Sequence, residues 1–198
     1  MSEAPAGWTR ATLGEVATVG SGGTPDRTQP RFWGGDIPWV TTGEIRFDTI
    51  TDSAEKITPE GLENSAARVF AAGTLLMAMY GQGRTRGQVA RLGIAAATNQ
   101  ACAAIQPRAH CHAEYLFQYL AANYQRIREL GNAGTQQNLN AGLIRGIVLP
   151  LPPLREQERI ARMALDWDAA IATTERLLAN SRRQKHDLML VLLGGRRH

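Results

Sequence analysis

The stretch PLPPLREQERIARMALDWDAAIATTERLLANSRRQKHDLMLVLL, residues 150–193, decides the fold of this chain. Prolines at 150, 152 and 153 end any preceding helix and favour an extended backbone, because proline lacks an N–H and restricts its neighbour. Residues 154–193 contain neither proline nor glycine. A helix of about 40 residues would be about 60 Å long, which is too long for one small core to cover. We therefore expect a globular domain at residues 1–150 and a long helix within residues 151–198.

One side of the long helix carries an apolar stripe. Ten residues follow the alternating steps of three and four that define positions a and d of a coiled coil: Ile160, Met163, Trp167, Ala170, Thr174, Leu177, Ser181, Gln184, Leu188 and Val191. Such a stripe on a protruding helix has to be covered by another helix. The expected dimer interface comprises Ile160, Met163, Trp167, Ile171, Thr174, Leu177, Leu178, Ser181, Leu188 and Val191. The open alternative is a helix that breaks near Asn180 and folds back on itself.

The first 150 residues predict a small domain of mixed strands and short helices joined by glycine-rich loops. The chain as a whole is therefore expected to be α+β in class. Buried strands at 73–80 and 88–92 are expected to pair as a hairpin. Proline at position 38 would place a strand at 37–41 on a sheet edge, because proline donates no hydrogen bond to a neighbouring strand. Thr58 and Pro59 are typical of an N-cap and a first helical position, and residues 112–130 have helical periodicity.

Composition excludes several classes of protein. Two cysteines, Cys102 and Cys111, are too few for a disulfide framework, and no apolar run is long enough for a membrane span. The N-terminus lacks the features of a secretory signal, so the reducing cytoplasm is the expected location. The net charge of +4 divides into −5 for residues 1–66, +6 for residues 67–153 and +3 for residues 154–198. A polyanion is expected to be attracted mainly to the middle segment.

Residues 81–87, GQGRTRG, lie at the tip of the expected hairpin. A phosphate-binding Walker A loop needs lysine and then serine or threonine after its last glycine, and a dinucleotide fingerprint opens a helix, so neither pattern fits. Arginine can bind O6 and N7 of guanine, and glutamine can bind N6 and N7 of adenine. We predict that the tip contacts DNA through Gln82, Arg84, Thr85, Arg86 and Gln88. Taken alone, the tip could equally be a solvated turn.

Three further loops have similar polar chemistry, at residues 21–27, 41–44 and 131–140. Loops rich in amides and hydroxyls are either flexible linkers or surfaces that recognise base edges. The second group of predicted DNA-binding residues comprises Thr24, Arg27, Thr41, Thr42, Gln136, Gln137 and Asn138.

Signatures of catalysis are few. The sequence contains no nucleophile elbow of the form Gly-x-Ser-x-Gly and no zinc-type Cys-x-x-Cys pair. His110, Cys111 and His112 are adjacent, so their side chains point apart, and no fourth group of ligands accompanies them. We expect no catalytic residue, no metal and no cofactor on this chain.

Several segments together resemble the specificity subunit of type I restriction-modification systems. They are Trp8, LGE at 13–15, GGTP at 22–25, GDIPWV at 35–40, TNQ at 98–100, GTQQN at 134–138 and LPPLREQERI at 151–160. They occur in the family's order and cover nearly the whole chain. Each segment is weak alone, and the combination is specific.

The resemblance implies a non-catalytic subunit that recognises double-stranded DNA within a methyltransferase and endonuclease complex. Methyltransferase subunits would dock along the long helix and bring S-adenosylmethionine, and a restriction subunit is an optional further partner. Family members carry two recognition domains and two long helices, whereas one of each is expected here, so the chain resembles a half-size form. We expect antiparallel homodimerisation and recognition of two inverted half-sites, although pairing with a different half stays open.

Two other classes of protein compete with this interpretation. A structural adaptor would use the long helix to bind a protein partner and would not recognise DNA. An enzyme acting alone would need a cofactor-binding loop, which the sequence does not show. The amide-rich loops favour DNA recognition over both.

Overall fold

The computed structural model describes residues 5, 7–81, 84–131 and 138–194. The chain divides into two compact units, residues 1–158 and 159–198. The strands of the first unit are β1 (Thr9–Thr12), β2 (Ala17–Ser21), β3 (Trp33–Val40), β4 (Thr49–Ile50), β5 (Glu55–Ile57), β6 (Val69–Phe70), β7 (Leu75–Ala78), β8 (Val89–Leu92), β9 (Ala96–Thr98), β10 (Cys102–Pro107) and β11 (Val148–Leu151). Its short helices are α1 (Leu13–Val16), η1 (Pro30–Phe32), η2 (Thr42–Glu44), α2 (Pro59–Glu63), α3 (Ala113–Ala122), α4 (Tyr124–Leu130) and α5 (Ala141–Arg145), and helix α6 (Leu154–Leu193) continues into the second unit.

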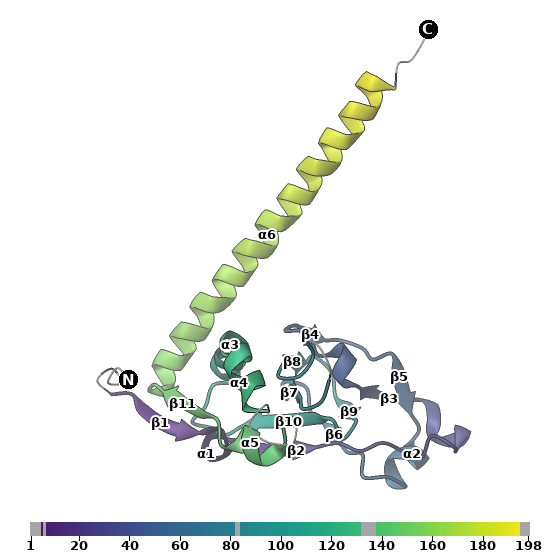
Figure 1. Ribbon diagram of the computed structural model, residues 1–198, viewed down its shortest axis with the longest axis vertical. Coiled ribbons are helices and arrows are strands. Elements are labelled where there is room, and N and C mark those ends of the chain that lie inside the picture. The colour runs from purple at the N-terminus through teal and green to yellow at the C-terminus, as the bar shows by residue number, and fades with distance from the viewer. Residues whose placement is uncertain (1–4, 6, 82–83, 132–137, 195–198) are drawn as a thin grey trace. The chain divides into compact units, whose positions relative to one another are not determined.

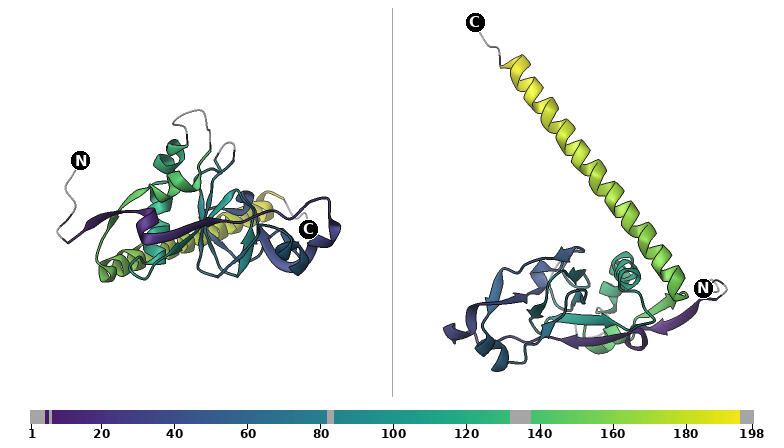
Figure 2. Two further views of the ribbon diagram at one scale, coloured as in Figure 1. Left: turned by 90° about the horizontal axis from the view of Figure 1, so that it is seen from below. Right: turned by 180° about the vertical axis from the view of Figure 1, so that it is seen from behind.

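The strands of the first unit form three sheets (Figure 1). Strand order is β2-β10-β7-β8-β4 in the largest sheet and β5-β3-β9-β6 in the next, and β1 pairs with β11 in a separate ribbon. Figure 2 shows this ribbon next to the N-terminus, where the first and last strands of the unit lie side by side. The mixed sheets and the 40-residue helix α6 confirm the predicted α+β class.

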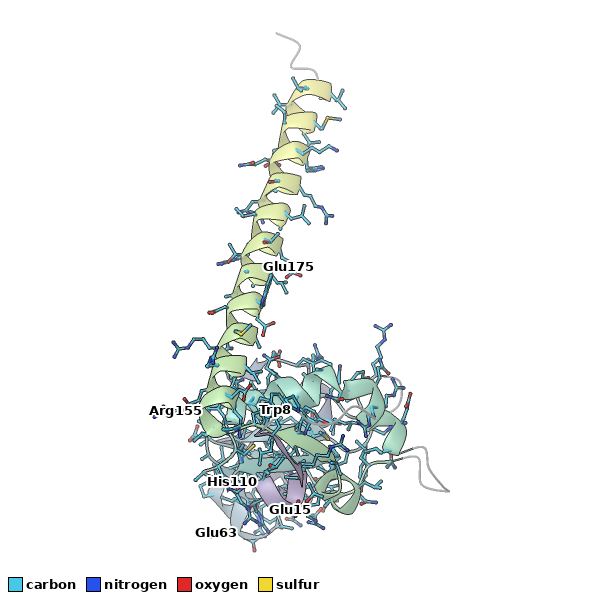
Figure 3. All side chains as sticks on the ribbon, turned by 90° about the vertical axis from the view of Figure 1, so that its left-hand side faces the viewer. Trp8, Glu15, Glu63, His110, Arg155 and Glu175 are labelled. Atoms are coloured by element: carbon cyan, nitrogen blue, oxygen red, sulfur yellow. The ribbon has the colours of Figure 1, made fainter. Side chains whose placement is uncertain are left out.

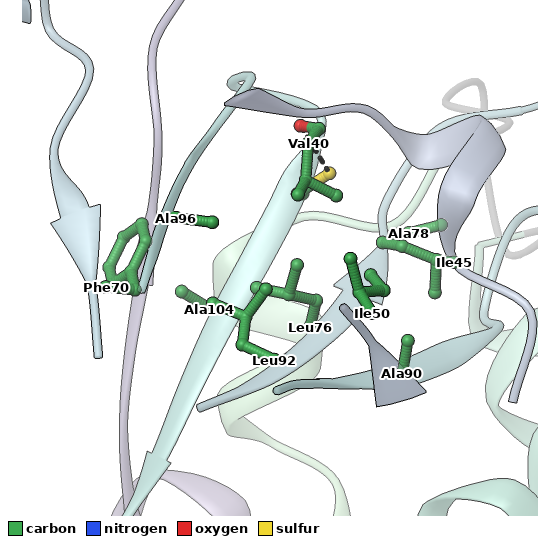
Figure 4. Close-up of a cluster of buried hydrophobic side chains, with 11 residues drawn as sticks. Val40, Ile45, Ile50, Phe70, Leu76, Ala78, Ala90, Leu92, Ala96 and Ala104 are labelled. Atoms are coloured by element: carbon green, nitrogen blue, oxygen red, sulfur yellow. Dashed lines mark hydrogen bonds between the residues drawn. The ribbon is translucent and has the colours of Figure 1, made fainter. Parts of the chain in front are cut away.

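A hydrophobic core cluster lies where the two larger sheets face each other (Figure 4). The largest sheet supplies Leu76, Ala90, Leu92 and Ala104, and the four-stranded sheet supplies Val40, Phe70 and Ala96. Small alanines alternate with larger aliphatic residues here, which lets the two layers approach closely. A second cluster around Trp39 and Ile57 covers the other side of the four-stranded sheet.

The predicted hairpin and helix start are confirmed. Strands β7 and β8 pair antiparallel, with Leu76 opposite Ala90. Thr58 is the N-cap of α2, and its hydroxyl accepts a hydrogen bond from the Gly61 N–H at 3.1 Å. Such a cap satisfies one of the amide groups that the first turn of a helix leaves unpaired.

Two local predictions are wrong. Strand β3 lies inside its sheet, between β5 and β9, and not at an edge. Pro38 is tolerated there because Trp39 and Val40 are the residues of β3 that pair with β9, so the pairing with this neighbouring strand begins after the proline. The expected helix at 112–130 is divided at Asn123, whose backbone (φ −97°, ψ 15°) ends α3 and precedes α4.

The start of helix α6 is fixed within the first unit by side-chain hydrogen bonds. The buried Gln157 accepts from the His112 N–H at 2.8 Å and donates to the carbonyls of His110 and Pro152 at 3.1 and 2.8 Å. The Trp8 indole donates to Glu156 at 3.1 Å, and Figure 3 marks Trp8 and Arg155 in this region. The family-like segments at Trp8 and at 151–160 therefore meet in space.

The rest of helix α6 leaves large apolar side chains in solvent. Nine of the ten predicted interface residues are exposed, and Ile160 is half-buried. Trp167 is 68% exposed, Leu177 61% and Val191 70%, which are unusual values for side chains of this size. No break occurs near Asn180, so the fold-back alternative is wrong. Among the described residues, no helix is both long and apolar enough to span a membrane.

Both cysteines are buried as neutral thiols, which predicts a pH dependence of stability. Burial raises the pKa of Cys102 to about 12 and that of Cys111 to about 11, from a usual value of about 9. Above pH 9 the unfolded chain ionises these thiols while the native chain keeps its protons, so stability falls with rising pH. Urea unfolding at pH 8 and pH 10.5 measures the fall. In a Cys102→Ala and Cys111→Ala double variant, the unfolding free energy should fall less between these pH values. An equally large fall in the double variant would contradict the assignment of the effect to the thiols.

Candidate nucleic-acid interface

Hydrogen bonds link the described parts of the four polar loops identified in the sequence, and we call this linked set the row of polar loops. The Asn99 N–H donates to the Val40 carbonyl at 3.0 Å, which joins the turn after β9 to the loop after β3. The Met79 N–H donates to the Ala101 carbonyl at 2.8 Å, and the Leu139 N–H donates to the Met79 carbonyl at 3.0 Å. Backbone hydrogen bonds therefore connect the described parts of residues 40–44, 98–101, 79–87 and 138–140 to one another.

The first loop joins this row through its threonine. The Thr24 hydroxyl donates to the Gln100 side chain, and the Gly23 N–H donates to the Thr98 carbonyl at 2.9 Å. Gly22 and Gly23 are needed because a Cβ at either position would overlap the backbone of Thr98 or Ala66. The two glycines of the GGTP segment thus have a packing role and bring Thr24 beside Gln100.

At the hairpin tip, the structure separates the two arginines. Arg84 is exposed, whereas Arg86 is only 8% exposed and its side chain lies beside Gly131. Thr85 and Gln88 are half-buried, and the Gln88 N–H donates to the Thr85 carbonyl at 3.0 Å. Gly81 and Gly87 have positive φ values of 139° and 85°, which explains two of the three glycines. Gln82 lies outside the described residues.

The amide-rich segment meets the hairpin tip. Gly131 lies close to Asn138 and to Arg86, so the packed Arg86 side chain links the two loops. Asn138 is exposed, and Leu139 is buried and holds the segment in place. Asn140 caps helix α5 by accepting a hydrogen bond from the Leu143 N–H at 2.9 Å. Gln136 and Gln137 lie outside the described residues.

Two predicted contact residues are engaged within the protein. Arg27 pairs with Glu55 through both guanidinium nitrogens, at 2.5 and 2.8 Å, and lies over the Trp33 ring at 3.8 Å from its centroid. These hydrogen bonds lower the pKa of Glu55 and raise that of Arg27. Thr41 caps η2, because its N–H and hydroxyl both donate to Glu44 at 2.7 and 2.9 Å. Thr42, next to it, is half-buried.

The histidine and cysteine segment has a structural role. The His112 Nδ1 accepts a hydrogen bond from the Tyr115 N–H at 3.4 Å and so caps α3, and Cys111 is buried. Among the described residues, no three histidine, cysteine, aspartate or glutamate side chains are grouped as metal ligands would be.

Sequence reasoning missed several residues of this surface. Gln100 belongs to a family-like segment, and its hydrogen bond to Thr24 could not be inferred from that segment alone. Tyr124 and Arg128, on α4, reach the hairpin tip, and Phe47 lies against Tyr124. No spacing in the sequence connects position 47 with positions 84 and 124, so only the fold brings these residues together.

Comparison with known proteins gives a consistent result. The family described as type I restriction modification DNA specificity domain matches residues 5–180. The type I restriction enzyme MjaIX specificity subunit of Methanocaldococcus jannaschii is 25% identical over 175 residues, covering 84% of this chain and 39% of that protein.

Solved structures show the same fold. A chain from a study of complex assembly and conformational transition in the type I restriction-modification system aligns with a TM-score of 0.77 and 20% identity, covering 98% of this chain and 46% of that one. The HsdS subunit from Thermoanaerobacter tengcongensis aligns with a TM-score of 0.68 and 20% identity, covering 89% and 41%. The chain therefore spans about two fifths of the length of these proteins.

Proposed function

Because this chain belongs to the family of type I restriction-modification DNA specificity domains, we propose that it is a non-catalytic specificity subunit that recognises double-stranded DNA. Its partners would be methyltransferase subunits, which supply S-adenosylmethionine and the chemistry, and a restriction subunit in systems that contain one. The observation that carries the proposal is the row of four polar loops joined by backbone hydrogen bonds. Residues 1–150 would form the recognition domain, and residues 151–198 would hold the dimer and set the spacing.

Seven exposed or half-buried polar side chains of the row are the proposed base and phosphate contacts. They are Thr24, Thr42, Arg84, Thr85, Gln88, Gln100 and Asn138. Arg27 and Thr41, whose side chains are hydrogen-bonded to Glu55 and Glu44, and Arg86, which is packed beneath the tip, would hold the loops of this surface in shape. Phosphate contacts would orient the domain, and contacts to base edges would give the specificity.

The apolar stripe of helix α6 supports a second copy of this chain as its cover. Residues 154–175 hold three basic and five acidic side chains, and residues 176–193 hold four basic and one acidic. An antiparallel pair would place the acidic half of each helix against the basic half of the other. It would also align Ile160 with Val191 and Met163 with Leu188 of the second copy. Two recognition domains related by a twofold axis would then contact inverted half-sites separated by a spacer.

Methylation mapping tests the proposed function. Cells that carry this chain with its methyltransferase partner should acquire methylation at a single bipartite sequence with inverted half-sites. Cells with the methyltransferase alone provide the control and should lack it. An asymmetric site would indicate pairing with a different half, and no new methylation would contradict the proposal. An adaptor without DNA recognition would also ignore competition by unlabelled duplex of random sequence.

Arg84→Ala is expected to weaken binding to the mapped site by about 5- to 150-fold, which corresponds to about 1–3 kcal/mol for one guanine contact. Binding to a scrambled duplex should change much less. Arg10→Ala is the control, because Arg10 is also exposed and lies in the separate ribbon of β1 and β11. Fluorescence titrations at two salt concentrations measure both losses. An equal loss on both duplexes would identify a phosphate contact, and no loss would remove Arg84 from the interface.

A further inference from the structure

Phe47 has an unusual backbone conformation beside the hairpin tip. Its φ of 61° is the only positive value at a non-glycine residue in the described part of the chain. Bulky side chains rarely adopt this region, and such residues tend to lie at functional sites where surrounding contacts enforce them. The Phe47 side chain is 37% exposed, so burial of the ring in the core does not explain the conformation.

Strand β8 enforces this conformation through two backbone hydrogen bonds. The Phe47 N–H donates to the Val89 carbonyl at 2.8 Å, and the Arg91 N–H donates to the Asp48 carbonyl at 2.9 Å. The fully buried Ile45 anchors the same loop from the other side. The ring of Phe47 is thereby held next to the point where the hairpin tip returns into β8.

The Phe47 ring contacts Tyr124, and Tyr124 contacts the tip. The two rings meet edge to face, with centroids 5.2 Å apart and an angle of 85° between their planes. The Tyr124 hydroxyl donates to the Arg84 carbonyl and accepts from the Arg128 guanidinium at 3.4 Å. On the same side, the backbone at Gly87 lies next to helix α4, where an added Cβ would be in van der Waals contact at 3.4 Å from the Arg128 backbone nitrogen. Helix α4 therefore holds the backbone of the exposed arginine.

We propose that Tyr124, steadied by Phe47, is a positioning residue that sets where Arg84 meets DNA. The inference rests on the proposed function, since it assigns Tyr124 a role only through Arg84. A long arginine side chain on a glycine-rich tip would otherwise lose much conformational freedom on binding, and fixing its backbone in advance reduces that loss. By fixing the backbone of Arg84, the aromatic pair would favour binding to the correct base, because arginine must approach a guanine edge in a defined direction.

Tyr124→Phe removes the hydroxyl that holds Arg84 and keeps the ring that packs on Phe47. Affinity for a duplex carrying the mapped site should fall by about three- to tenfold, the range for one lost hydrogen bond, with little change for a scrambled duplex. Tyr119→Phe is the matched control: its hydroxyl donates to the Val148 carbonyl at 2.9 Å, away from the tip, and affinity should stay within about twofold. Binding is measured with the full chain and its methyltransferase partner.

A double variant separates positioning from general stability. If Tyr124 acts through Arg84, Tyr124→Phe should have almost no further effect in an Arg84→Ala background. An undiminished effect there, an equal loss in Tyr119→Phe, or no loss in Tyr124→Phe while Arg84→Ala weakens binding would each overturn the inference and leave the proposed function standing. A wild-type chain that fails to distinguish the mapped duplex from the scrambled one would overturn both.

Discussion

Replacing Gly22 with alanine is expected to destabilise the first unit by at least about 3 kcal/mol, because the added Cβ has no space. It would lie 1.9 Å from the Thr98 carbonyl oxygen and 2.4 Å from the Thr98 hydroxyl. Thr98 cannot move away easily, since it is fully buried, pairs with Val40 across the sheet and accepts a hydrogen bond from Gly23. The loop itself would have to shift, and Thr24 would then leave Gln100.

Gly20→Ala provides a closely matched control for this substitution. Gly20 lies two residues earlier in β2, its backbone is extended, and an added Cβ would meet nothing within 4 Å. Its unfolding free energy in urea should change by no more than about 0.5 kcal/mol. Sequence-specific binding should be lost in Gly22→Ala and retained in Gly20→Ala. Equal stability of the two variants would mean that the loop does not approach Thr98 as closely as the structure indicates.

The long helix and the β7–β8 hairpin could be predicted because both depend on local sequence patterns. The prolines at 150, 152 and 153 and the absence of glycine and proline in residues 154–193 indicated α6, and two apolar runs joined by the glycine-rich segment 81–87 indicated the β7–β8 hairpin. These features depend on backbone chemistry and periodicity, which neighbouring residues determine. The polar loops were also recognisable by composition, although their arrangement in one row was not.

The roles of individual side chains could not be predicted to the same extent. Arg84 and Arg86 are two positions apart in the sequence, and nothing local shows that Gly131 would leave room for the Arg86 side chain. The expectation that Arg27 contacts DNA stays a prediction: its side chain is 52% exposed, but its pairing with Glu55 and its position over the Trp33 ring could not be predicted. Pro38 predicted an edge strand because proline cannot donate to a neighbouring strand, but the pairing of β3 with β9 begins only at Trp39, so the missing donor does not matter. In each case the deciding partner is distant in the sequence.

A substitution in the apolar stripe of helix α6 is expected to have the second large effect, on dimerisation. Leu177 is 61% exposed in the single chain, and the antiparallel alignment would place it opposite Thr174 of the second copy, near the twofold axis. Leu177→Glu would put an unpaired carboxylate into that contact in both chains, at a cost of about 2 kcal/mol each. The dissociation constant of the dimer should then rise by about a thousandfold.

Ala179→Glu introduces the same carboxylate at an exposed position two residues along, on the side of the helix away from the stripe, and should leave dimerisation unchanged. Sedimentation equilibrium measures the dimer dissociation constant of both variants, and a wild-type chain that stays monomeric at high concentration would contradict the dimer.

The relative orientation of the two helices can be tested with single introduced cysteines, since the native thiols are buried. An antiparallel pair should form a disulfide only when Met163→Cys and Leu188→Cys chains are mixed, whereas a parallel pair would crosslink each variant to itself. Because the proposed dimer supplies the two recognition domains that a bipartite site requires, loss of the dimer in Leu177→Glu should abolish methylation of that site in cells, even though every residue of the row of polar loops is intact.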